Sequence, residues 1–378
     1  MDFRFSDEQN TIRELARGIL EQEVTPERLK AAEAAGDRID AALWKTLAEA
    51  NLLGIAVPEA QGGMGLGLLE LCTLLEELGR TVAPVPALAA LAQGGLAIAR
   101  FGSEAQRERW LRPLASGDAL LSLALVDAGS DDVARPATRA KRDGAAWILD
   151  GAKRLVAVGG RAARVIVPAV TDGGVGLFLI DPNAPGVTSA AQRSSTGEPL
   201  FDLTLAGVRA SADDLLGDDA SGGAAALRWL HDASIAALCV TQSGVSERAI
   251  EITTAYVRER IQFGVPIGSF QSVQHRAADC WIDLQAMRWT AWRVAVRLTE
   301  GLDVARDTAV AKFWAADGGS RIANAAQHLH GGMGVDVDYP IHRYFLWSKA
   351  LELTLGSATP HLARLGRELA QSQPLELA

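Results

Sequence analysis

Two short segments in the C-terminal half combine a cationic side chain, aromatic residues and glycines in a spacing suited to binding a diphosphate. They read Arg260-Ile-Gln-Phe263-Gly264 followed by Phe270-Gln271, and His328-Leu-His-Gly331-Gly332-Met-Gly334. A guanidinium pairs bidentately with phosphate oxygens, and glycines let a backbone approach a pyrophosphate closely. Read functionally, the two segments favour a dinucleotide cofactor.

Each segment taken singly also has a purely structural interpretation, and by itself that interpretation is the more common one. The first could be a helix that ends at Gly264 with Arg260 in its last turn, and the second a glycine cap at a helix C-terminus. The residues alone leave both interpretations open.

The sequence lacks the motifs of metal sites, of common hydrolases and of NAD-binding or nucleotide-hydrolysing proteins. No histidine has the His-Glu-x-x-His spacing or the cysteine neighbour of a metal site, so we expect no metal. No Gly-x-Ser-x-Gly elbow, P-loop or Rossmann glycine pattern stands between a strand and a helix. A net charge of −9 and a pI near 5.3 argue against nucleic acid as a partner.

Hydrophobic periodicity divides the 378 residues into three parts. Ser6 to about Gly117 has helical spacing, with a helix start at Ser6 and another helix ending at Gly79. Short apolar runs then predict strands without intervening helices, hence an antiparallel sheet or barrel. Helical spacing resumes after a linker at 218–223. We expect an N-terminal helical domain (1–119), a middle antiparallel β-domain (120–222) and a C-terminal helical domain resembling a four-helix bundle (223–378).

The composition indicates a globular protein in a reducing compartment. Only three cysteines are present, too few and too scattered for a disulfide framework. The first ten residues lack the features of a secretory signal, and no apolar stretch is long enough to span a membrane. We therefore expect a cytoplasmic protein.

In their order along the chain, these segments resemble the acyl-CoA dehydrogenase family over essentially the whole sequence. The resemblance is carried by Leu53-Gly-Ile-Ala-Val-Pro-Glu-Ala-Gln-Gly-Gly-Met-Gly-Leu66, Leu74-Leu-Glu-Glu-Leu-Gly79, Arg-x-x-Phe-Gly at 260–264 and His-Gly-Gly-x-Gly at 330–334. It implies an α+β multidomain fold, FAD as cofactor, an acyl-CoA substrate, α,β-dehydrogenation and an electron-transfer flavoprotein as acceptor.

The sequence departs from the family where a base is needed. The reaction requires a carboxylate to remove the α-proton while a hydride passes to the flavin. Counting from Gly331 to the family's Tyr-Glu-Gly-Thr motif reaches Thr354-Leu355-Gly356-Ser357, and Leu355 cannot accept a proton. The alternative position used by a minority of members corresponds to Ser234, which is no base without an activating partner.

The flavin-facing side of the β-domain departs as well. The family's Thr-Glu-Pro stretch is replaced by Ala124-Leu125-Val126, and its aromatic-Ile-Thr strand by Leu155-Val156-Ala157. Both flavin-contacting hydroxyls are missing. Ile235 also stands where an arginine near the CoA thioester is common, although Asp232 is kept.

In contrast, this sequence retains the residues that, in the family, hold the ADP half of a neighbouring subunit's FAD. They are Arg260, Phe263, Gln271, Gly331 and Gly332, with His328 in place of a usual glutamine. A subunit that lost its own site but kept these groups fits an α2β2 heterotetramer with a catalytic homologue, as in bacterial enzymes acting on steroid side-chain thioesters. Two alternatives stay open: a homo-oligomer whose base is Asp232 or Glu352, and a non-enzymatic acyl-CoA-binding or scaffold protein.

Overall fold

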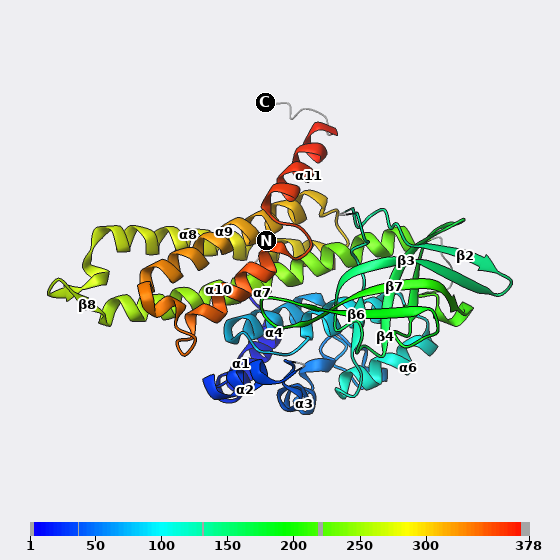
Figure 1. The fold of residues 1–378 in the computed structure, drawn as a ribbon, viewed down its shortest axis with the longest axis horizontal. Coiled ribbons are helices and arrows are strands. Elements are labelled where there is room, and N and C mark those ends of the chain that lie inside the picture. Colours follow the sequence, from blue (N-terminus) through cyan, green and yellow to red (C-terminus); the bar gives the residue numbers. More distant parts are fainter. Residues whose placement is uncertain (1–3, 37, 131, 218–221, 372–378) are drawn as a thin grey trace. The chain divides into compact units, whose positions relative to one another are not determined.

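The computed structural model describes residues 4–36, 38–130, 132–217 and 222–371, and its contacts separate two compact units. One unit contains Met1–Leu74 and Ala83–Ser234, and the other contains Leu75–Val82 and Ile235–Ala378. Figure 1 shows the element order along the chain. Part of the 218–223 segment that we expected to be a linker lies outside the described residues.

The first unit begins with helices whose starts were readable in the sequence. Ser6 and Gln9 form a reciprocal capping box at the start of α1, as predicted, and Ser103 and Gln106 repeat it at α6. The segments are α1 (Asp7–Glu23), α2 (Pro26–Ala34), α3 (Ala41–Glu49), η1 (Leu52–Gly54), η2 (Glu59–Gln61), α4 (Leu68–Thr81), η3 (Leu88–Gly95), α5 (Leu96–Phe101) and α6 (Glu104–Ala115).

The predicted end of a helix at Gly79 is wrong, because α4 continues to Thr81. Gly79 is there for close packing: a Cβ on it would lie 2.2 Å from the carbonyl oxygen of Thr241. Gly244 has the same role on the facing helix, because a Cβ there would lie 2.0 Å from the carbonyl oxygen of Glu76. The end of α4 and α7 (Gly223–Glu259) therefore cross at backbone contact.

Seven strands follow, and they form one sheet in the order β1-β4-β2-β3-β7-β6, with β5 paired to β4. They are β1 (Leu121–Leu123), β2 (Arg139–Asp143), β3 (Ala146–Ala157), β4 (Arg164–Thr171), β5 (Gly174–Ile180), β6 (Val187–Arg193) and β7 (Pro199–Ala210), before the short η4 (Ala212–Asp214). Its core includes Trp147 edge-on to Phe178, with ring centroids 5.5 Å apart. The expected antiparallel sheet needs one correction, because β4 pairs in parallel with β1 and, at Arg139, with β2.

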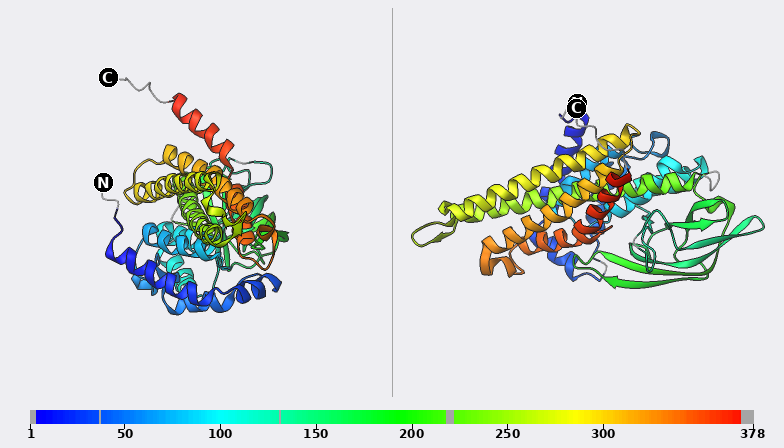
Figure 2. Two further views of the ribbon diagram at one scale, coloured as in Figure 1. Left: turned by 90° about the vertical axis from the view of Figure 1, so that its left-hand side faces the viewer. Right: turned by 90° about the horizontal axis from the view of Figure 1, so that it is seen from above.

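Long helices make up most of the second unit, and Figure 2 views them along and across their axes. After α7 the segments are β8 (Ile261–Gln262), β9 (Val265–Pro266), η5 (Ile267–Ser269), α8 (Gln271–Thr299), α9 (Ala305–His330), η6 (Gly331–Val335), α10 (Ile341–Leu353) and α11 (Ala358–Gln371). None of the helices in the described ranges is long and apolar enough to cross a membrane.

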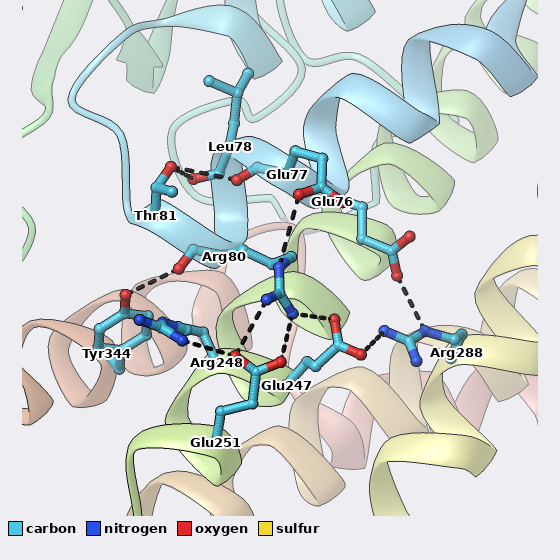
Figure 3. Close-up of polar contacts among 10 residues, drawn as sticks. All are labelled: Glu76, Glu77, Leu78, Arg80, Thr81, Glu247, Arg248, Glu251, Arg288 and Tyr344. Carbon is cyan, nitrogen blue, oxygen red and sulfur yellow. Dashed lines mark hydrogen bonds and ion pairs between the residues drawn. The ribbon is translucent and has the colours of Figure 1, made fainter. Parts of the chain in front are cut away.

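A partly buried network of ion pairs joins the end of α4 to α7 and α8 within this unit (Figure 3). The Arg80 guanidinium contacts Glu77, Glu247 and Glu251, while Arg288 contacts Glu76 at 3.0 Å and Glu247 at 2.9 Å. Burial would raise the pKa of the Glu247 carboxyl, but the two guanidinium groups outweigh it and hold that pKa below its ordinary value. The network therefore keeps the Glu247 carboxylate ionised.

Candidate functional site

The first predicted segment forms a hairpin at the end of α7. Its helical interpretation is wrong: α7 ends at Glu259, and Phe263 and Gly264 are the two turn residues between β8 and β9, with φ of 56° and 81°. Arg260 joins the helix to the hairpin, and its carbonyl accepts the amide of Ile267 at 2.8 Å. Phe263 is 91% exposed, and its ring meets the ring of Phe270 edge-on with centroids 6.1 Å apart.

The second predicted segment caps α9 as its glycines indicated. Gly331 ends the helix with φ 56°, a conformation that favours glycine, and η6 follows from Gly331 to Val335. A Cβ placed on Gly331 or Gly332 would meet no atom within 4 Å, so this backbone is open to an approaching ligand. His328 lies exposed in the last turn of α9.

Two contacts bring these segments to the same end of the second unit. The Tyr256 ring, one turn before Arg260, stacks on the buried His330 ring with centroids 4.4 Å apart. The Arg276 guanidinium of α8, whose first residue is Gln271, lies 2.5 Å from Nδ1 of His328. These contacts link the segments that carry the six residues predicted to contact the cofactor: Arg260, Phe263, Gln271, His328, Gly331 and Gly332.

The segment predicted to face the reacting carbon is the turn between α10 and α11. Leu355 has φ 56° and Gly356 has φ 96°, so the chain reverses sharply there. The Leu355 carbonyl lies 2.9 Å from Nε2 of His361. A leucine side chain offers no group that accepts a proton, and its backbone oxygen is already engaged.

A buried lysine holds the helix that leads into this turn. Lys312 of α9 is fully buried and donates to the carbonyls of Leu351 and Glu352 at 2.8 and 2.9 Å, in the last turn of α10. Burial lowers its pKa to about 8. An ammonium group at a helix C-terminus also meets the negative end of the helix dipole.

The alternative bases are engaged elsewhere. Glu352 pairs with Lys349 on its own helix at 2.5 Å. Asp232, in the first unit, is buried and lies 3.1 Å from Nδ1 of His231. The Ser234 hydroxyl is fully buried and donates to the Leu230 carbonyl at 2.6 Å, which leaves it no role as a base.

The strands that the family presents to the flavin have no hydroxyl at the predicted positions. Ala124 and Leu125 are buried in the first unit. The Ala157 carbonyl accepts the Ser122 hydroxyl at 2.6 Å. Leu155 sits on an irregularity of β3 with φ 52°, is 58% exposed, and is held by its amide, which donates to Asp202 at 3.0 Å. Asp131, part of the Gly-Ser-Asp segment, lies outside the described residues.

Three ionic side chains near these segments were missed in the sequence. Lys153 is fully buried and contacts Asp127 at 2.7 Å, and Lys312 and Arg276 make the contacts given above. Buried lysines give no sequence signal, because their partners come from distant parts of the chain. Arg276 had a weak signal, since it lies on the same helix as Gln271 and five residues after it.

Among the residues that the structure describes, no group of three or more His, Cys, Asp or Glu side chains is arranged to hold a metal ion. The three cysteines are buried and unbridged. The site is therefore built from cations, aromatic rings and exposed glycine backbone.

The helical segments, the central sheet and the helical second unit define a dehydrogenase architecture, and the comparisons identify its family. The N-terminal domain of acyl-CoA dehydrogenases matches residues 6–118, and their C-terminal domain matches residues 222–370. The chain therefore belongs to the acyl-CoA dehydrogenase family. The resemblance and the fold class derived from the sequence are confirmed.

Individual relatives match along nearly the full length. Acyl-CoA dehydrogenase FadE27 of Mycobacterium tuberculosis is 36% identical over 98% of this chain and 100% of its own. A variant of the Tcur3481-Tcur3483 steroid ACAD is 44% identical, with a TM-score of 0.90, over 96% of this chain and 98% of the other. The ChsE4-ChsE5 complex from M. tuberculosis includes a chain that is 36% identical, with a TM-score of 0.93, over 99% of this chain and 100% of the other.

Proposed function

We propose that this chain is the non-catalytic subunit of an α2β2 acyl-CoA dehydrogenase, in which it completes the FAD site of a homologous catalytic subunit. The observation that carries the proposal is the side chain at position 355, where the family's glutamate base is replaced by a leucine that cannot accept a proton. Relatives found in two-component complexes, Tcur3481-Tcur3483 and ChsE4-ChsE5, support this assembly. The division into domains 1–119, 120–222 and 223–378 is part of the same proposal.

The residues at the hairpin end fit the ADP half of FAD. Arg260 is exposed and has no carboxylate partner among the described residues, so its guanidinium is available to a phosphate. The open backbone at Gly331 and Gly332 can approach the same diphosphate, and Phe263 supplies an apolar face. Bound FAD supplies the hydride acceptor, and these residues bind and orient it.

The residues of the first unit fit the flavin ring less well. Ala124 offers no hydroxyl, and the Ala157 carbonyl is already hydrogen-bonded. We therefore assign the α,β-dehydrogenation to the partner's flavin and base. The substrate class is a bulky acyl-CoA thioester, as the name of the steroid ACAD relative suggests, and an electron-transfer flavoprotein is the proposed acceptor.

The test is to remove Arg260 from this chain inside the assembled complex. Arg260→Gln should weaken FAD binding to the complex about 10- to 100-fold, because a charge-assisted phosphate contact is lost, while native mass shows intact assembly. Arg306→Gln is the matched control, since Arg306 is an exposed arginine at the opposite end of α9. Equal FAD retention in both variants would contradict the proposal.

A further inference from the structure

An open groove of about 720 Å³ runs between α8 and α9, and one end of it reaches the proposed cofactor residues. Arg276 of α8 and His328 of α9 line that end, and Arg321 lines the groove further along. All three residues belong to the second unit. Their different partners decide what each can bind.

The contact between Arg276 and His328 fixes the protonation of the histidine. Nη1 of Arg276 lies 2.5 Å from Nδ1 of His328. A guanidinium has donors and no acceptor, so Nδ1 must accept, and the proton of the neutral imidazole must be on Nε2. The pair therefore offers only donors to a ligand: the remaining N–H groups of Arg276 and the Nε2–H of His328.

The two groove arginines differ in how far their charge is neutralised. Arg321 is held by Asp283 through two hydrogen bonds of 2.7 Å and also contacts Asp317. Arg276 forms no ion pair with a carboxylate among the described residues, although Asp279, three residues along α8, also lines the groove; its close contact is the Nδ1 atom of His328. The guanidinium of Arg276 is therefore less neutralised than that of Arg321 and lies beside a second kind of donor, which suits a phosphate.

We propose that Arg276 is a phosphate-binding residue that acts with His328 on the diphosphate of a nucleotide. This rests on the proposed function, which includes His328 but not Arg276. It also explains the departure from glutamine at position 328. A glutamine amide carries its own donor, and the histidine offers an equivalent donor at Nε2 while Arg276 holds the ring through Nδ1.

The experiment measures binding of ADP, inorganic pyrophosphate and adenosine to the flavin-free complex by calorimetry. Arg276→Gln should weaken ADP and pyrophosphate about 10- to 100-fold, the range for one charge-assisted contact, and leave adenosine unchanged. Arg321→Gln is the matched control, because it removes an arginine from the same groove that already has carboxylate partners.

His328→Gln tests the tautomer argument. If the two side chains act together, His328→Gln should change the affinity for pyrophosphate less in the Arg276→Gln background than in the wild type, because the contact through Nδ1 that positions the ring is already lost. Two outcomes overturn the inference: an Arg276→Gln affinity within about twofold of Arg321→Gln, or a loss shared equally by adenosine and pyrophosphate. If Arg260→Gln still releases FAD in that case, the proposed function stands and only the role of Arg276 fails.

Discussion

Single residues decide whether this chain can perform the proton transfer. The turn after α10 carries Leu355, and the nearest carboxylate on the same helix, Glu352, is paired with Lys349. The ammonium of Lys312 binds the main chain of Glu352 and leaves its carboxylate outside that contact. The side chains around this turn are thus engaged in holding the helix end.

Replacing the Glu352 carboxylate should leave turnover of the assembled complex unchanged. Glu352→Gln should keep kcat within about twofold, whereas loss of a general base costs 10²-fold or more. Lys349→Gln is the matched control, because it breaks the same ion pair and keeps the carboxylate. Turnover is measured with a dye as electron acceptor, and a large loss of kcat in Glu352→Gln but not in Lys349→Gln would show that Glu352 is the base. Asp232→Asn applies the same test to the other candidate base.

The buried Lys312 predicts a pH dependence of stability. Burial lowers its folded-state pKa from 10.5 to about 8, so between these values the unfolded chain holds a proton that the folded chain has lost. Stability therefore rises with pH through this window and is lowest below it, by about 3 kcal/mol for a shift of this size. Urea unfolding should show this rise in wild type and its absence in Lys312→Met. Lys349→Met, at a partly exposed lysine, should keep it; parallel curves for wild type and Lys312→Met would refute the assignment.

At the scale of elements, the end of α4 is fastened to the long helices by backbone contact and by charge. Gly79 and Gly244 allow α4 and α7 to touch, and the Arg80 network surrounds that crossing (Figure 3). Glycines at a crossing cannot be replaced without separating the helices, and a buried guanidinium cannot be removed without taking a cation from its carboxylates.

Removing Arg80 should destabilise the protein strongly. Arg80→Met removes the cation shared by Glu77, Glu247 and Glu251. Glu247 keeps Arg288 and Glu251 keeps Arg248, so the cost, about 3 kcal/mol, comes mainly from the buried Glu77. Arg293→Met, which breaks the exposed pair with Asp307, should cost less than about 1 kcal/mol. The free energy of unfolding of each variant is measured in urea. Similar losses for the two variants would show that the Arg80 network stabilises the protein no more than an exposed ion pair does.

The elements also show what the sequence could and could not predict. Local signals worked, because the capping box at Ser6 and the helix end at Gly331 depend on neighbouring residues. Glycines that serve distant contacts were misread: Gly79 packs against α7, and Gly264 closes a hairpin. The parallel pairing of β4 and the partners of Arg276 depend on long-range contacts, for which one sequence carries no signal.

At the scale of the whole molecule, the account requires a second, catalytic chain. The proposed function explains the retained groups at the hairpin end and the missing base together, because it assigns the cofactor that they hold to a partner. The exposed Phe263 fits that assignment, because an apolar ring at 91% exposure in the single chain gains cover from a partner's site.

The most direct measurement is the number of FAD molecules per chain, by absorbance together with native mass. The chain is to be expressed alone and again together with a catalytically complete homologous dehydrogenase subunit from the same organism. The account predicts about one FAD for every two chains, found only in the co-expressed heterotetramer, because only the partner supplies a complete flavin face. One FAD per chain in a homo-oligomer of this protein, bleached by an acyl-CoA, would contradict it.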